Sequence, residues 1–247
     1  MITRIAMWSG PRNISTALMR SFGSRPDTHV SDEPLYAHYL ASTGASHPRA
    51  DEIIDQHEVD WAVVASKLTG PTPSGETVWY QKHMAHHLLP AIDRSWLEGF
   101  RHAFLIREPR AMLASLVAKL GDARLEDTGL PQQVKIFRWV ESVTGETPPV
   151  VVGTDIQRDP AGVLAALCAA LGLEFDDAML SWDTGPRSTD GCWGPFWYGN
   201  TYRSTGFAPY LHREVDLAPA YRVLATECQE LYDQLAVHSI QTDASRA

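Results

Sequence analysis

The chain contains few cysteines and no excess of positive charge, and each lack excludes a class of protein. Its three cysteines, Cys168, Cys192 and Cys228, are odd in number and widely spaced, so we expect neither a disulfide framework nor a zinc site. Lysine and arginine number 21 against 30 aspartates and glutamates, which gives a formal net charge of −9. That balance argues against a nucleic-acid binder or a basic membrane-surface protein, although it permits a local cationic pocket.

Long hydrophobic runs are also lacking. The longest apolar run, residues 163–173, is too short to cross a bilayer. The first residues enter a predicted strand without the cationic stretch, apolar core and cleavage site of a signal peptide. We therefore expect a cytoplasmic protein with no membrane partner. The composition is ordinary and no boundary or repeat divides the sequence, so we expect a single domain over residues 1–247.

Short runs rich in valine and isoleucine alternate with segments of helical character. This alternation predicts a three-layer α/β/α fold with a central parallel sheet, and such folds bind ligands at the carboxyl ends of the strands. A segment over 182–209, rich in glycine, proline and aromatic residues, predicts a lid or binding loop. The expected strands are 2–8, 28–31, 78–81, 102–106 and 150–152, and the expected helices are 15–22, 51–68, 86–97, 110–120, 131–144, 160–171 and about 217–238.

The loop after the first strand has the features of an anion site. A loop between a buried strand and a helix turns backbone N–H groups and the helix N-terminus toward one point, and Arg12 can donate to two phosphate or sulfate oxygens. A P-loop kinase would carry Gly-Lys before the serine or threonine, whereas here Ile14 directly precedes Ser15. The residues expected to bind the anion are Gly10, Pro11, Arg12, Asn13, Ile14, Ser15 and Thr16.

A second candidate anion site combines Arg107 with Ser115. Arg107 ends a predicted strand, Pro109 suits the first turn of the next helix, and Ser115 lies off the apolar stripe of that helix. Both side chains are therefore free to meet one anion at the sheet edge. Taken alone, the same residues would suit a surface arginine paired with Glu108 and a solvated serine.

Together these segments resemble the sulfotransferases that use 3′-phosphoadenosine 5′-phosphosulfate, and the resemblance implies a fold like that of the P-loop NTPases. Residues 11–16 fall on the family's Pro-Lys-Ser-Gly-Thr-Thr loop, with arginine in place of lysine and isoleucine in place of glycine. The family holds the donor's 3′-phosphate with an arginine and a serine eight positions apart, which is the spacing of Arg107 and Ser115. Residues 154–173 resemble the family's strand exit and its Asp-Pro … Leu-Gly helix.

The aromatic segment carries a further part of the resemblance. Arg187 and Trp193 are similar to parts of the loop that folds over the nucleotide in the family, although this chain is one residue shorter there and lacks the loop's second cation. The resemblance implies that Arg187 reaches the 3′-phosphate and that Trp193 contributes to nucleotide or acceptor binding. Arg203 is a rival to Arg187 for the phosphate.

The resemblance also implies a base that deprotonates the acceptor hydroxyl. Some family members place a histidine two positions after a strand-end lysine, but after Lys82 that position holds Met84, and His83 comes one residue too early. Others use a glutamate after the second strand, where this chain has Glu33. We therefore favour Glu33 as the base, with His83 second.

His86 or His87 is a third candidate for the base. Arg12 and Lys82 are expected to offset charge on the departing oxygen. The histidines lack a third metal ligand at suitable spacing, so we expect no metal.

The function implied by the resemblance is transfer of a sulfuryl group from 3′-phosphoadenosine 5′-phosphosulfate to a hydroxyl of a small molecule or glycan. Two alternatives remain open at this point: a P-loop small-molecule kinase using ATP, or a catalytically silent nucleotide-binding protein of the same fold. No nucleic-acid partner is expected. The sequence does not indicate the acceptor or the oligomeric state.

Overall fold

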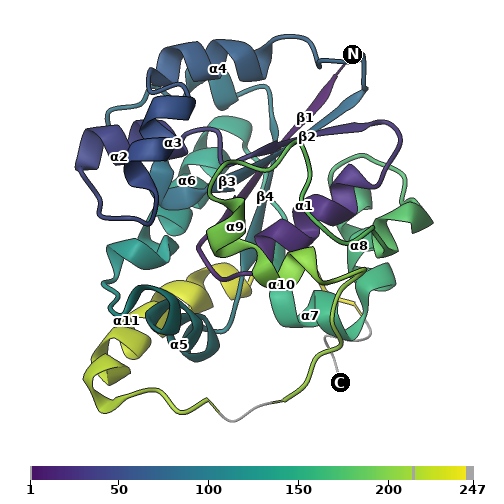
Figure 1. The fold of residues 1–247 in the computed structure, drawn as a ribbon. Coiled ribbons are helices and arrows are strands. Elements are labelled where there is room, and N and C mark those ends of the chain that lie inside the picture. The colour runs from purple at the N-terminus through teal and green to yellow at the C-terminus, as the bar shows by residue number, and fades with distance from the viewer. Residues whose placement is uncertain (1, 213–214, 243–247) are drawn as a thin grey trace.

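The central sheet has the parallel arrangement that the sequence predicts. A computed structural model describes residues 2–212 and 215–242. Within them the strands pair in parallel in the order β2-β3-β1-β4-β5 (Figure 1). All five expected strands are confirmed, although β3 continues past Gln81. The strands are β1 Thr3–Ser9, β2 Thr28–Asp32, β3 Val78–Met84, β4 Arg101–Ile106 and β5 Val150–Val152.

Helices cover both faces of the sheet, which gives the three expected layers (Figure 1). Alternate residues of a strand face opposite sides of the sheet, and β1 uses both sides for apolar packing. Ile5 and Met7 pack against α1 Ser15–Gly23, α7 Gly153–Arg158 and α8 Pro160–Ala170. Ala6 and Trp8 belong to the cluster that includes α4 Trp61–Thr69, α6 Leu130–Thr144 and α11 Arg222–Ala236.

Several predicted helices have different boundaries in the structure. The expected helix over 51–68 is two helices, α3 Ala50–Gln56 and α4, because Asp60 interrupts it and caps α4 by accepting a bond from the Ala62 N–H at 2.8 Å. The expected helix over 86–97 is wrong: this stretch holds two 3₁₀ turns, Ala85–His87 and Ser95–Leu97, and Pro90 between them cannot donate the hydrogen bond of a continuous helix.

Two more boundaries complete the helical layers. The C-terminal helix is shorter than 217–238, since a 3₁₀ turn over Pro219–Tyr221 precedes α11. α5 Pro109–Leu120 matches its expected range, with the Glu108 carboxylate capping its first turn. α2 Tyr36–Thr43 and α7 were not predicted. In the part of the chain that the structure describes, no helix has the length and apolar character to cross a membrane.

The aromatic segment 182–209 folds against the carboxyl ends of the strands and contains two short helices, α9 Gly194–Trp197 and α10 Gly199–Tyr202 (Figure 1). Two of the contacts that hold it there involve α1 and β2. Arg20 of α1 donates from both terminal nitrogens to the two carboxylate oxygens of Asp190, each at 2.7 Å. The Gly191 N–H donates to Asp32 Oδ2 at 3.2 Å. The segment is therefore part of the wall around the strand ends.

Candidate functional site

The loop between β1 and α1 takes an unusual backbone path. Arg12 has φ 65° and Ile14 has φ 57°, a left-handed conformation that residues with a Cβ rarely adopt. The side chain of Ile14 packs against the apolar cluster beneath α1, which holds the turn in place. Ile14 also supplies no side-chain oxygen to cap α1. The N–H groups of the first turn of a helix have no intrahelical partner, and in α1 the residues that carry them, Ser15, Thr16 and Ala17, line a cavity.

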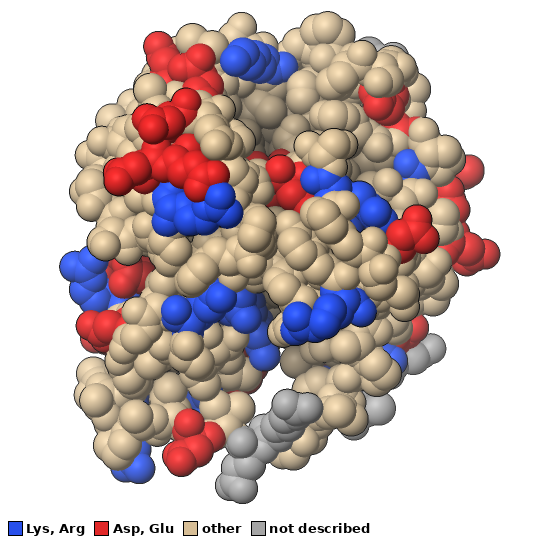
Figure 2. All heavy atoms as spheres, viewed as in Figure 1, with Lys and Arg blue, Asp and Glu red and all other residues tan. Residues whose placement is uncertain are grey.

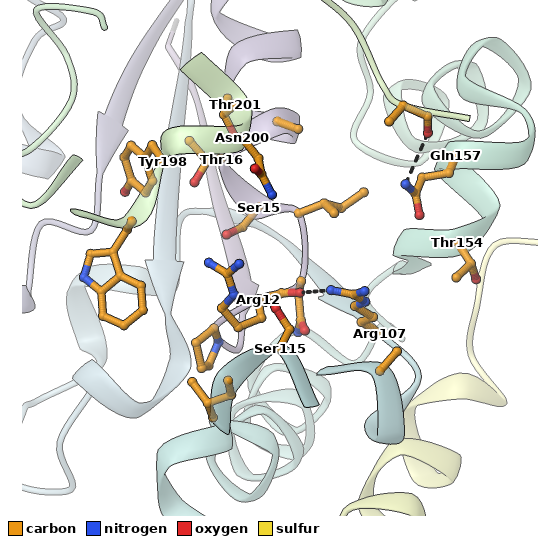
Figure 3. A pocket seen from close by; sticks show the side chains of 18 of the residues that line it. Arg12, Ser15, Thr16, Arg107, Ser115, Thr154, Gln157, Tyr198, Asn200 and Thr201 are labelled. Carbon is orange, nitrogen blue, oxygen red and sulfur yellow. Dashed lines mark hydrogen bonds between the residues drawn. The ribbon is translucent and has the colours of Figure 1, made fainter. Parts of the chain in front are cut away.

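Arg12, Ser115 and Arg107 meet beside this loop although they lie far apart in the sequence. Arg12 Nε donates to Ser115 Oγ at 2.9 Å, and Arg107 Nη1 donates to the backbone oxygen of Arg12 at 2.7 Å. Figure 3 shows Arg12 between Ser15 and Ser115, with Arg107 next to them. The first candidate anion site and the second are thus neighbours. One side chain of the second site also braces the backbone of the first.

The two guanidinium groups carry charge that no carboxylate neutralises among the residues described. Neither Arg12 nor Arg107 forms an ion pair there. Burial lowers the pKa of both groups, and the charge of Arg12 lowers that of Arg107 further, against a smaller opposing effect of Glu108. Two half-buried cations held close together are stabilised by an anion that binds between or beside them. This arrangement supports an anion-binding site.

A cavity of about 750 Å³ opens beside these groups. Figure 2 shows basic side chains gathered across the lower middle of the face where α5, α7 and α10 lie, despite the negative net charge of the chain. The lining residues from the loop and its surroundings include Pro11, Arg12, Asn13, Ile14, Ser15, Thr16, Glu33, Lys82, Arg107 and Ser115.

A buried polar network closes one part of the cavity wall. Lys82 Nζ donates to Asp32 Oδ1 at 2.8 Å, to the Tyr198 hydroxyl oxygen at 2.8 Å and to Glu33 Oε1. These contacts use all three N–H donors of the ammonium group. Although burial alone would lower the pKa of Lys82, Asp32 and Glu33 raise it. Lys82 is therefore a buried ammonium that holds two carboxylates, which leaves it no donor for a ligand oxygen in this arrangement.

Glu33 combines a strained backbone with a perturbed carboxylate. Its φ is 44°, in the left-handed region, and its side chain lines the cavity. Burial raises the pKa of Glu33, and the neighbouring Lys82 opposes this rise. A carboxylate with a raised pKa is a better proton acceptor near neutral pH than an exposed one. Left-handed residues other than glycine are also concentrated at functional sites.

The structure places His83 away from the cavity. Side chains alternate along β3, so Lys82 and Met84 line the cavity while His83 faces the other side of the sheet. There its ring stacks on Trp8 with ring centres 4.7 Å apart, and burial lowers its pKa to about 3. The hypothesis that His83 is the second-choice base needs correction on this ground.

Arg187, Trp193 and Arg203 do not line the cavity either. Arg187 donates to the backbone oxygen of Asp183 at 2.9 Å, and Arg203 donates to Asn200 Oδ1 at 2.8 Å. Trp193 is buried and donates from Nε1 to the Tyr198 hydroxyl at 2.8 Å. Gly10 is likewise outside the lining, packed against the backbone of Thr128. The roles expected for these residues as direct ligands therefore have no support from the geometry.

Sequence reasoning missed that Asp32 and Tyr198 bind Lys82. Asp32 stands directly before Glu33 at the end of β2, a position that could have drawn notice. Tyr198 is one of several aromatics in the 182–209 segment, and nothing in the sequence marks it as the one that reaches Lys82. Within the described residues, no cluster of three histidine, cysteine, aspartate or glutamate side chains is arranged to hold a metal ion.

Comparison with known proteins places these features in a family. The sequence model of the family described as "Sulfotransferase domain" matches residues 3–218. Two curated proteins of Arabidopsis thaliana are similar in sequence: branched-chain-amino-acid aminotransferase-like protein 2 is 35% identical over 95% of this chain, and protein 1 is 37% identical over 83%. The chain spans only 41% and 36% of the length of these relatives.

Solved structures share the fold. The sulfotransferase domain of the Synechococcus PCC 7002 olefin synthase has a TM-score of 0.60 at 18% identity, with 94% of this chain and 95% of that one covered. The sulfotransferase from Alicyclobacillus acidocaldarius has a TM-score of 0.54 at 14% identity, with 100% of both chains covered. The likeness extends over nearly the whole chain.

Proposed function

Because the chain belongs to the sulfotransferase domain family, we propose that it transfers a sulfuryl group from 3′-phosphoadenosine 5′-phosphosulfate to an acceptor hydroxyl. The observation that carries this proposal is the pair of guanidinium groups, Arg12 and Arg107, which have no carboxylate partner among the described residues and lie beside the N-terminus of α1. Both ends of this donor are anionic, and the site offers two neighbouring sources of positive charge.

The donor is held at two points in this proposal. The backbone N–H groups of residues 13–16, with Arg12, Ser15 and Thr16, bind the 5′-phosphosulfate at the start of α1. Arg107 and Ser115 bind the 3′-phosphate. Arg107 donates to the backbone oxygen of Arg12, and Ser115 accepts a hydrogen bond from the Arg12 side chain. Binding of the phosphosulfate at one point therefore orders the residues at the other point.

Glu33 acts as the general base. The acceptor oxygen attacks sulfur as the bond from sulfur to the 5′-phosphate oxygen breaks; the electron pair of that bond goes to the phosphate oxygen, and the proton of the hydroxyl goes to the Glu33 carboxylate. Arg12 and the loop N–H groups stabilise the charge that develops on the phosphate. Lys82 and Tyr198 position Glu33 because both donate hydrogen bonds to Oε1 of its carboxylate. Most of the rate gain comes from positioning and electrostatics.

Nucleotide binding followed by product analysis tests the proposal. Adenosine 3′,5′-bisphosphate should raise the melting temperature, and ATP with magnesium should raise it less. Incubation with the phosphosulfate donor and a broad set of hydroxyl compounds should yield a product heavier by one sulfuryl group. Magnesium-dependent ATP turnover without bisphosphate binding would instead support a kinase. Bisphosphate binding with no acceptor sulfated would support a silent nucleotide-binding protein.

A further inference from the structure

Four aromatic side chains line the part of the cavity next to Glu33. They are Tyr36 of α2, His47 in the segment after α2, and His86 and His87 directly after β3. The ring of His87 stacks on Tyr36 with ring centres 4.5 Å apart and planes within 10°. The Tyr36 hydroxyl and His47 Nδ1 are hydrogen-bonded at 2.8 Å. These contacts make a rigid wall, which we call the histidine wall, beside the proposed base.

The histidine wall carries no positive charge that a ligand could use. The lysine and arginine residues among the described cavity lining are Arg12, Lys82 and Arg107, and the Lys82 donors are all engaged with Asp32, Glu33 and Tyr198. Burial lowers the pKa of His86 to about 3, and burial also lowers the pKa of His47 and His87. At neutral pH the three rings are therefore uncharged.

Carboxylates give this part of the cavity a negative bias. Glu33 and Asp127 both line it. Asp32 accepts a hydrogen bond from Lys82, which also donates to Glu33. Asp127 has Arg124 as its ion-pair partner, at 3.6 Å, but that guanidinium is largely exposed. An anionic group placed here would lose its hydration and meet carboxylates, with no unengaged cation beside it among the described lining residues, which is costly inside a protein.

The histidine wall also has unused hydrogen-bonding capacity. His86 and His87 are both buried, and Nδ1 of each ring has no hydrogen-bond partner among the residues described. His87 Nδ1 lies 4.0 Å from Glu33 Oε2, too far for a direct bond. Buried polar atoms are rarely left unpaired in proteins. An uncharged polar group that entered beside His87, with a small adjustment of that ring, would satisfy its Nδ1.

We propose that the histidine wall and Glu33 form the acceptor subsite, and that it takes uncharged hydroxyl compounds and rejects those that carry a carboxylate or phosphate. The inference rests on the proposed function, since it assigns the acceptor class of the same site. The cavity is thus divided by charge, with the cations at the donor end and neutral or acidic groups at the acceptor end. Such a division keeps an anionic acceptor from competing for the donor's place.

A pair of phenols of the same shape tests the acceptor class. 4-Hydroxyphenylacetamide and 4-hydroxyphenylacetate differ only in an uncharged amide against a carboxylate. Each is titrated into the protein saturated with adenosine 3′,5′-bisphosphate, and the dissociation constants are measured by calorimetry. We expect the amide to bind at least about tenfold more tightly, a difference of about 1.4 kcal/mol. Equal or tighter binding of the carboxylate would overturn the proposal, and so would a failure of both compounds to bind.

A charge introduced into the histidine wall supplies a second readout. His47→Lys places an ammonium group at the lining, and His47→Gln is its uncharged match. In the lysine variant the preference for the amide should be about tenfold smaller than in the glutamine variant. The new ammonium group can pair with the carboxylate of 4-hydroxyphenylacetate, and the wild-type wall has no such partner. An unchanged preference in a folded His47→Lys protein would count against the charge argument. If that variant does not fold, the wild-type pair of phenols decides.

The two proposals fail in different ways. If adenosine 3′,5′-bisphosphate does not bind, the proposed donor site is wrong, whatever the two phenols do. If the bisphosphate binds and the carboxylate phenol is preferred, the donor site stands and only the acceptor class is wrong.

Discussion

Arg107 Nη1 donates a 2.7 Å hydrogen bond to the backbone oxygen of Arg12, so the end of β4 supports the left-handed turn that follows β1. The two residues are 95 positions apart in the sequence. This contact joins the two halves of the proposed donor site into one unit. It also explains how a loop without glycine at its turning points keeps its shape.

The strain at Ile14 predicts that glycine is tolerated there at least as well as alanine, the reverse of the usual order in a helix. Ile14→Ala removes apolar packing but keeps a Cβ at φ 57°, whereas Ile14→Gly removes both. A left-handed residue with a Cβ costs about 1–3 kcal/mol, so the glycine variant should be at least as stable as the alanine variant in urea unfolding.

The matched control for Ile14 lies in the middle of α5. There Ala114→Gly should lose about 1 kcal/mol, as is usual for glycine in a helix. If Ile14→Gly proved less stable than Ile14→Ala by a similar amount, the turn would not be strained as described.

The role of Glu33 predicts a loss of turnover without a loss of donor binding. Glu33→Gln removes the proton acceptor and should lower kcat by about 10²–10⁴-fold, while the affinity for adenosine 3′,5′-bisphosphate stays close to that of the wild type. Glu98→Gln makes the same change at an exposed glutamate outside the cavity lining and should have little effect on kcat. Steady-state kinetics and calorimetry on both variants check this. A Glu33→Gln enzyme with ordinary kcat would remove Glu33 as the base.

The pH dependence of catalysis follows from the same carboxylate. Burial raises the pKa of Glu33, and only the ionised form accepts a proton. The value of kcat/KM should therefore fall as the pH decreases through this raised pKa, with a midpoint above that of an exposed glutamate. A rate profile from pH 4 to 9 measures it. If kcat/KM stayed constant as the pH was lowered to the pKa of an exposed glutamate, about 4.3, the assignment would be contradicted.

The buried pair of Arg20 and Asp190 predicts how the aromatic segment is held. Both side chains are nearly inaccessible, at 3% and 4% exposed, so Asp190→Ala leaves an unpaired guanidinium in the interior. Breaking such a pair costs about 3–5 kcal/mol, and hydrogen exchange should rise over residues 182–209. Asp183→Ala, an exposed change in the same segment, should alter neither quantity. Unchanged exchange in the Asp190 variant would show that other contacts hold the segment.

The sequence predicted the sheet because its strands are buried on both faces. A strand such as β5, with three consecutive valines, has no polar positions and stands out from its surroundings. The helix expected over 86–97 failed because Pro90 lies inside it and lacks the backbone donor of a continuous helix. Local composition thus fixed the strands better than the helix ends.

The site was predictable only in part. Arg12, Arg107 and Ser115 could be proposed from two short segments together with their resemblance to the family. His83 was misplaced because strand β3 runs three residues further than expected, which puts His83 on the opposite face from Lys82. The contact of Tyr198 with Lys82 joins residues 116 positions apart. No local pattern encodes such a pairing, since it depends on how the whole chain folds.

The central claim is that Arg107 binds the 3′-phosphate of the donor, and comparison of two nucleotides tests it most directly. Adenosine 3′,5′-bisphosphate and adenosine 5′-monophosphate are titrated by calorimetry into the wild type and Arg107→Ala, with Arg110→Ala as the control. In the wild type, loss of the 3′-phosphate should weaken binding by about 10- to 100-fold, as expected for a charge-assisted contact worth about 1.5–3 kcal/mol. In Arg107→Ala the two nucleotides should bind alike. If the wild type bound both nucleotides equally, or if Arg107→Ala kept the full preference for the bisphosphate, the account would be contradicted.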